Sequence, residues 1–72
     1  MNSDSGKNIT ANSLGERLKT AREKLGLTQS DVAKKSGMTV NYYAMIERGE
    51  VNPSFEKMQS LAKTLKLKIT IS

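Results

Sequence analysis

Three isolated glycines divide most of this chain into segments that are too short to be stable as lone helices. Gly26, Gly37 and Gly49 each follow a stretch in which apolar residues recur at helical spacing, and glycine is common just beyond a helix end. The two stretches between Gly26 and Gly49 hold at most 11 residues each, and helices of that length are marginal in water by themselves. The segments must therefore pack on one another, which predicts an all-α fold of short helices.

Four N-cap signals mark the starts of four predicted helices. A Ser or Thr hydroxyl accepts from a free backbone N–H of the first turn, and an acidic residue three positions later completes a capping box. The signals are Ser13 with Glu16, Thr28 with Asp31, Thr39, and Ser54. The residues that helical periodicity turns inward are Leu14, Leu18, Ala21 and Leu25; Val32 and Ala33; Tyr43 and Ile46; and Phe55, Met58, Leu61, Ala62 and Leu65. With 72 residues in all, these helices form one domain.

Residues 1–12 show no such pattern. They are rich in Asn, Ser, Thr and Gly and contain a single Ile, which predicts a disordered N-terminal arm. Lys7 is the only basic side chain of the arm, and a DNA contact by the arm is the alternative interpretation.

The composition excludes several classes of function. The chain has no His and no Cys, which excludes the common zinc sites, thiol nucleophiles and disulfides. Its carboxylates fall at caps and at solvated positions, without a pair at catalytic spacing. No apolar run is long enough to cross a bilayer or to form a secretion signal. We therefore expect a cytoplasmic protein that is not an enzyme and that binds no cofactor, no metal and no membrane.

The charge of the chain favours a polyanionic partner. Twelve Lys and Arg against seven Asp and Glu give a net charge of +5. Residues 13–37 and residues 54–72 each carry +3, whereas residues 38–53 carry −1. A nearly neutral segment between two basic ones suits an element that reads bases while its neighbours hold phosphates.

The predicted third helix has one face that is free to make contacts. If Tyr43 and Ile46 point inward, Asn41 and Met45 point away from the core at 100° per residue. An exposed Met in a polar stripe is typical of a contact surface, and a merely solvated helix face is the alternative. In a DNA major groove the amide of Asn41 can pair with adenine, while Val40 and Met45 can meet thymine methyl groups.

A motif of two short helices joined by a turn occupies residues 29–48, "QSDVAKKSGMTVNYYAMIER". With "TQ" at residues 28–29, "IERG" at 46–49 and "NPS" at 52–54, the chain resembles the phage-repressor and Cro-like, or XRE, helix-turn-helix family. The resemblance implies a lambda-repressor-like DNA-binding domain over residues 13–66. It also implies a sequence-specific regulator of transcription that binds double-stranded DNA and represses from a palindromic operator. It places base-reading residues at Val40, Asn41, Tyr42 and Met45, and phosphate contacts at Gln29, Arg48, Asn52 and Lys57.

Arg22 borders the apolar stripe of the first predicted helix, where a half-buried cation needs a partner. Glu47 borders the inward face of the third helix in the same way, and related repressors pair an Arg and a Glu at these matching positions. We expect an ion pair between Arg22 and Glu47 that fixes the reading helix. A phosphate contact by Arg22 is the alternative.

The tail "LKLKITIS", residues 65–72, alternates apolar and polar side chains, as a strand does. A lone strand leaves its backbone groups unpaired. We therefore expect residues 67–72 to pair across a homodimer, with Leu67, Ile69 and Ile71 on the buried face; a frayed tail is the alternative. The tail also resembles that of DNA-binding antitoxins in kinase-type toxin modules, which implies a second candidate function as an antitoxin that neutralises a toxin partner.

Overall fold

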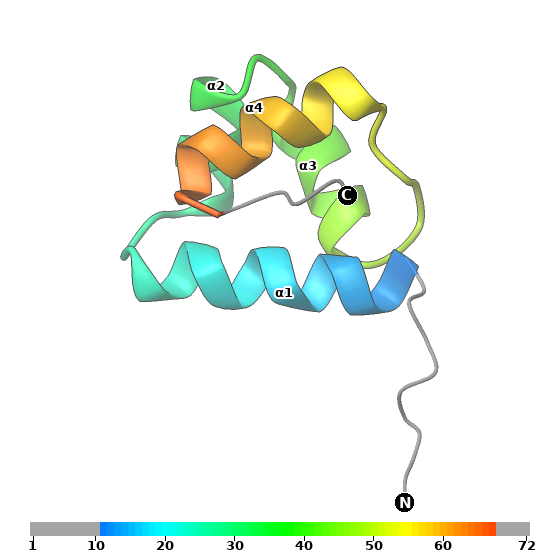
Figure 1. Cartoon of the computed structure of the whole chain (residues 1–72), viewed down its shortest axis with the longest axis horizontal. Helices are drawn as coiled ribbons and strands as arrows, with labels where there is room; N and C mark the ends of the chain where they lie inside the picture. The colour runs from blue at the N-terminus through cyan, green and yellow to red at the C-terminus, as the bar shows by residue number, and fades with distance from the viewer. Residues whose placement is uncertain (1–10, 68–72) are drawn as a thin grey trace, which may run out of the picture.

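The computed structural model describes residues 11–67 and forms four helices within that range. They are α1 (Ala11–Lys24), α2 (Gln29–Lys35), α3 (Val40–Glu47) and α4 (Phe55–Leu65). In Figure 1, α1 runs along one side of the molecule and α4 along the other, and α3 lies between them. The all-α prediction is confirmed for residues 11–67, where no strand is formed. None of these helices combines the length and the apolar character needed to cross a membrane.

The predicted caps of α2, α3 and α4 are confirmed. The Thr28 hydroxyl accepts from the Asp31 N–H at 3.0 Å, and the Asp31 carboxylate accepts from the Thr28 N–H at 2.9 Å, a complete capping box. The Thr39 hydroxyl accepts from the N–H of Tyr42, and the Ser54 hydroxyl accepts from that of Lys57. Each side chain satisfies a backbone donor that the helix leaves free.

The predicted start of α1 is wrong by three residues, because Ser13 as the N-cap would make Leu14 the first helical residue. The helix begins at Ala11, so that Ser13 lies inside it and not at its N-cap. Alanine is the strongest helix former, and its position ahead of Ser13 extends the first turn. The predicted boundary between residues 12 and 13 therefore falls within α1.

The helices end where the sequence predicts. Gly26, Gly37 and Gly49 have φ values of 70°, 73° and 79°, which a residue without a Cβ adopts at little cost. The end of α4 is different, because Lys66 occupies the left-handed region with φ of 59° although it is not a glycine. The chain thereby leaves the helix before Leu67, which has irregular backbone. The rest of the predicted strand, including Ile69 and Ile71, lies outside the described residues.

One apolar core lies between the four helices. Its buried members are Leu18, Val32, Ala33, Tyr43, Ile46, Leu61 and Leu65. Two residues predicted to be inward are not: Leu25 is 39% exposed and Phe55 is 58% exposed. Leu25 follows the last residue of α1, and Phe55 is the first residue of α4, so each lies where its helix projects beyond the core.

α1 and α3 approach each other closely at Gly15, which is buried. A Cβ added there would lie 2.7 Å from the carbonyl oxygen of Ile46 and closer still to that of Glu47. Real Cβ atoms essentially never come so near to backbone atoms. The missing side chain therefore allows the first turns of α1 to lie against the last turn of α3.

Candidate nucleic-acid interface

α3 divides its side chains between two faces, as the sequence predicts. Tyr43, Ile46 and Glu47 are buried, whereas Val40 is 46% exposed and Asn41 is exposed beside it. α3 contacts both α1 and α2, so its inward face is held from two sides. The packing on α1 and α2 therefore fixes which face of α3 points outward.

Asn41 and Met45 lie next to each other on that outward face. The Nδ2 atom of Asn41 is 3.9 Å from the Met45 sulfur, the contact expected of residues one helical turn apart. Met45 is half-buried. The pair offers a polar amide and a soft apolar atom side by side, which matches the mixture of edges and methyl groups in a DNA major groove.

Tyr42 lies deeper than the sequence suggests. It is half-buried and packs against the core, and the Nζ atom of Lys57 lies 5.9 Å from the centre of its ring, at the limit of a cation–π contact. Lys57 of α4 is thereby held beside α3. A base contact by Tyr42 stays a prediction, and the structure places its ring between the reading face and α4.

The loop after α3 carries two of the predicted phosphate contacts. Arg48 caps the C-terminus of α3, and its Nε donates to the Glu50 carboxylate at 2.7 Å. Both side chains are about half exposed, so that the pair contributes little to stability. Asn52 is exposed in the same loop. A phosphate near this loop would compete with Glu50 for the guanidinium of Arg48.

The predicted ion pair between Arg22 and Glu47 is present. Arg22 Nε donates to Glu47 Oε2 at 2.6 Å, and Arg22 Nη2 donates to Glu47 Oε1 at 3.2 Å, a two-pronged contact. The two side chains are only 12% and 4% exposed. Arg22 also donates to the Leu27 carbonyl oxygen at 3.0 Å. We call this pair, together with its partners Leu27 and Gln29, the brace.

Gln29 belongs to the brace. Its Nε2 donates to Glu47 Oε1 at 3.0 Å, which joins the start of α2 to the end of α3. One of the two amide N–H groups of Gln29 therefore already has a partner inside the protein. The phosphate contact predicted for Gln29 stays a prediction. The brace thus connects α1, the turn after it, α2 and α3.

The brace and its surroundings shift three pKa values. Burial acts to raise the pKa of Glu47, but the hydrogen bonds that its carboxylate accepts from Arg22 and Gln29 outweigh burial and lower that pKa. The hydrogen bond to Glu47 raises the pKa of Arg22. Burial, together with the neighbouring Glu47 carboxylate, raises the pKa of Tyr43, whose hydroxyl has no partner with good hydrogen-bond geometry among the described residues. Both charges of the ion pair are therefore retained at neutral pH.

The two short helices joined by the turn at Gly37 agree with a family comparison. The helix-turn-helix family HTH_3 matches residues 18–71. The chain belongs to this helix-turn-helix family. The match covers α2 and α3 and extends over the whole of α4, and it agrees with the sequence-based expectation of a helix-turn-helix DNA-binding domain.

Three curated relatives carry regulator or repressor names. The chain is 45% identical over 51 residues to the HTH-type transcriptional regulator DdrOP3 of Deinococcus deserti, over 71% of this chain and 40% of the relative. It is 33% identical to the immunity repressor protein of Bacillus phage phi105, over 79% of this chain and 40% of the relative. It is 32% identical to an HTH-type transcriptional regulator of Archaeoglobus fulgidus, over 74% of this chain and 76% of the relative. The chain thus spans less than half of the first two relatives.

Solved structures show the same fold. The restriction-modification controller protein C.AhdI of Aeromonas hydrophila superposes with a TM-score of 0.78 at 33% identity, over 81% of this chain and 88% of the other. The clp gene regulator ClgR of Corynebacterium glutamicum gives a TM-score of 0.79 at 26% identity, over 85% of this chain and 65% of the other.

The lowered pKa of Glu47 leads to a prediction about acid stability. A carboxylate with a depressed pKa stabilises the folded state above its unfolded pKa, about 4.3, and this contribution is lost as the pH falls through the folded pKa. We expect the free energy of unfolding, measured by urea titration, to decrease as the pH is lowered from about 5. The exposed Asp31 and Glu50 also have lowered pKa values.

The matched variant Glu47→Gln isolates the contribution of Glu47. It retains the size of the side chain and removes its charge, so the variant should be less stable than the wild type at neutral pH and show a shallower loss below pH 5. Parallel pH profiles for the two proteins would contradict the assignment, because Asp31 and Glu50 would then account for the whole slope.

Besides the contact between Gln29 and Glu47, two structural contacts were missed by the sequence analysis. Gly15 permits the close approach of α1 to α3, and the signal for it was a glycine in a helix interior, where it costs about 1 kcal/mol relative to Ala. The buried Ser36 donates its hydroxyl to Thr64 Oγ1 at 3.0 Å and ties the end of α2 to α4. Nothing in the spacing of the sequence distinguishes this pair from other Ser and Thr residues.

Proposed function

We propose that this chain is a transcriptional regulator of the cytoplasm that binds a specific double-stranded DNA site and represses transcription from it. The observation that carries the proposal is the outward face of α3, formed by Val40, Asn41 and Met45. A helix of this size fits the major groove, the groove in which all four base pairs can be distinguished. The regulator and repressor names of the relatives support the proposal.

The amide of Asn41 is the proposed reader of an adenine. It can donate to N7 and accept from N6 of that base, while Val40 and Met45 pack against thymine methyl groups. Arg48, Asn52 and Lys57 flank this face and are proposed to hold the phosphate backbone. Arg48 exchanges its Glu50 partner for a phosphate, which costs little because both side chains are exposed.

The proposed operator is a palindrome that is bound by two copies of the chain. A two-fold axis would place two α3 helices about 34 Å apart, one helical turn of DNA, so that each copy reads one half-site. The homodimer is proposed to form through residues 67–72, with Leu67, Ile69 and Ile71 on its buried face. Its support is the strand-like alternation of these residues and the exposure of Leu67, 36%.

The antitoxin alternative stays a prediction. It rests on the likeness of residues 65–72 to the tails of such proteins, and most of this segment lies outside the described residues. A toxin partner would have to be sought by co-purification, and no described residue points to one.

Substituting Asn41→Ala tests the base-reading proposal. We expect the preferred site, selected from random duplex DNA, to lose discrimination at one or two base pairs per half-site, at about 1 to 3 kcal/mol per lost contact. The matched variant Lys57→Ala should weaken binding to all sequences alike and reduce the salt dependence of the affinity by about one unit of slope. The measurement is a binding titration against wild-type and single-base-substituted sites at several salt concentrations.

Two results would contradict the proposal. If the wild-type chain binds every duplex equally weakly at near-physiological salt, it is not a sequence-specific regulator. If Asn41→Ala leaves the selected site unchanged while the affinity stays high, another residue reads the DNA.

A further inference from the structure

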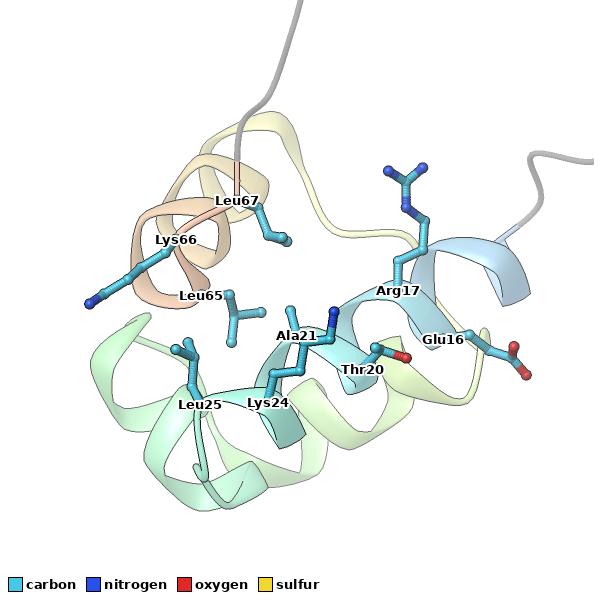
Figure 2. Close-up of a pocket in the computed structure, with 9 residues that line it drawn as sticks. All are labelled: Glu16, Arg17, Thr20, Ala21, Lys24, Leu25, Leu65, Lys66 and Leu67. Atoms are coloured by element: carbon cyan, nitrogen blue, oxygen red, sulfur yellow. The ribbon is translucent and has the colours of Figure 1, made fainter.

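An open groove lies between α1 and the end of α4, away from the reading face. Its volume is about 750 Å³, and its lining comes from α1, the turn after it and residues 65–67. Figure 2 shows the side chains of Leu25, Leu65 and Leu67 directed toward the space between the two helices, with Ala21 beneath them and Lys66 turned away. No residue of α3 lines the groove, so an occupant would leave the DNA-reading face free.

The groove exposes apolar surface that a folded chain normally covers. Leu25 and Leu67 are two of the four large apolar residues that stay exposed among the described residues. They face the same groove from opposite sides. Exposed apolar residues gathered in a hollow mark a contact site, whereas isolated ones are ordinary.

The sequence that follows Leu67 fits the groove in pattern and in length. Side chains two apart in a strand lie on the same face, so Ile69 and Ile71 share the face of Leu67 in an extended chain. Four extended residues beyond Leu67 span about 13 Å. The lining on the α1 side runs from Glu16 to Leu25, which is also about 13 Å along a helix axis.

The backbone of such a segment needs a partner that this groove does not supply. Its walls are helices, whose N–H and C=O groups are already bonded within each helix, except at the ends. A single strand in the groove would therefore bury unpaired backbone groups, which costs more than its apolar contacts return. A second copy of the same segment provides the missing donors and acceptors.

We infer that this groove seats the apolar face of residues 67–72 of a second copy of the chain, paired with the same segment of the first. The inference rests on the homodimer proposed above and adds its location: α1 and the end of α4 together form the seat. Leu25, an apolar residue exposed in the single chain, then becomes a dimer contact. α1 is held by the second copy on one side and by the brace through Arg22 on the other.

The absence of cysteine from the chain allows a direct test by disulfide cross-linking. One full-length chain carries Leu25→Cys, and a second chain, lengthened by a tag so that its mass differs, carries Ile69→Cys. The two are mixed, refolded together and oxidised. We expect a covalent dimer of mixed mass, because a disulfide forms only where two Cα atoms come within about 7 Å. The pair Leu25→Cys with Ile71→Cys tests the neighbouring register in the same way.

The matched control carries the cysteine at position 55, as Phe55→Cys, and keeps Leu25. Phe55 is also exposed but lies at the other end of α4, so Phe55→Cys should give no mixed dimer with either tail variant. Equal cross-linking from Phe55 and Leu25 would overturn the inference, since the tail would then contact the protein at random. If neither Leu25 pair gives a mixed dimer, the tail of a second copy does not lie in the groove, and this too overturns it.

A second measurement separates this inference from the proposals on which it rests. We expect Leu25→Lys to weaken dimerisation at least about tenfold in sedimentation equilibrium, because each copy loses one apolar contact and gains a charge. Phe55→Lys serves as the control, and the melting temperature verifies that both variants fold. A wild-type chain that is monomeric refutes the homodimer itself, whereas a dimer unaffected by Leu25→Lys refutes only its seat.

Salt distinguishes the seat from the DNA interface. The groove lining carries Arg17, Lys24 and Lys66 against the single anion Glu16, so two copies bring like charges together. Added salt screens this repulsion and should tighten the dimer, while it weakens binding to DNA through the release of counterions. A dimer that weakens with salt in parallel with DNA binding would contradict the proposed seat.

Discussion

Substituting Gly15→Ala should destabilise the folded chain by at least about 3 kcal/mol, enough to leave much of a domain of this size unfolded. In an unobstructed helix the same change would stabilise by about 1 kcal/mol, because alanine is the better helix former. Here the added methyl group would overlap the carbonyl groups of Ile46 and Glu47. Backbone cannot rotate away as a side chain can, so α1 must shift, and the steric term outweighs the helix propensity.

Gly26→Ala provides the matched control for this prediction. Gly26 has a positive φ of 70°, but no atom lies within 4 Å of an added Cβ. Gly26→Ala should therefore lower the free energy of unfolding only by the cost of an alanine in the left-handed conformation, about 1 to 2 kcal/mol. Urea denaturation followed by circular dichroism compares the two variants. A Gly15→Ala protein as stable as Gly26→Ala would show that α1 and α3 are less closely packed than the structure indicates.

Removing one member of the Arg22–Glu47 pair should be almost as harmful. The side chain of Arg22 is only 12% exposed, and Glu47→Leu removes the carboxylate that it binds. Leaving a buried charge without its partner costs about 3 to 5 kcal/mol. Arg22→Met leaves the buried carboxylate of Glu47 without its partner in the same way. The double variant should lose less than the sum of the two, because neither charge is then left without its partner.

A double-mutant cycle measures the coupling in this pair. Residues in contact deviate from additivity by about 0.5 to 3 kcal/mol, and the two hydrogen bonds between these side chains favour the upper part of that range. Arg48 and Glu50 form the natural comparison, since they are also paired but about half exposed. Their cycle should give less than about 1 kcal/mol. Additive losses for Arg22 and Glu47 would mean that the brace does not act as a unit.

The parts of this fold that depend on local chemistry were predictable from the sequence. The caps at Thr28, Thr39 and Ser54 follow from a hydroxyl placed directly before a helical stretch, where it can accept from a free backbone N–H of the first turn. Gly37 adopts a positive φ because it has no Cβ. The burial of Tyr43 and Ile46 follows from helical periodicity once the helix is located. Each of these predictions uses residues within one turn of one another.

The parts of the fold that depend on where helices end and where they cross could not be predicted from the sequence. Phe55 satisfies the periodicity of α4 and is still exposed, because periodicity gives the direction of a side chain and not how far the core extends along the helix. The role of Gly15 depends on α3, which follows it by more than twenty residues, and nothing in the spacing of the sequence shows where two helices cross. Gln29 was expected on the surface for the same reason: its Glu47 partner is distant in the sequence.

The division of α3 into two faces has a consequence for how such proteins can diversify. Tyr43, Ile46 and Glu47 are buried and make the contacts that hold the helix, whereas Val40 and Asn41 are exposed on the outward face. On the proposed base-reading role, substitutions at the outward positions would alter which DNA is recognised and would leave the buried contacts of α3 intact. On the same proposal, a gene duplication followed by two or three changes at these positions would yield a second protein that binds a different DNA site.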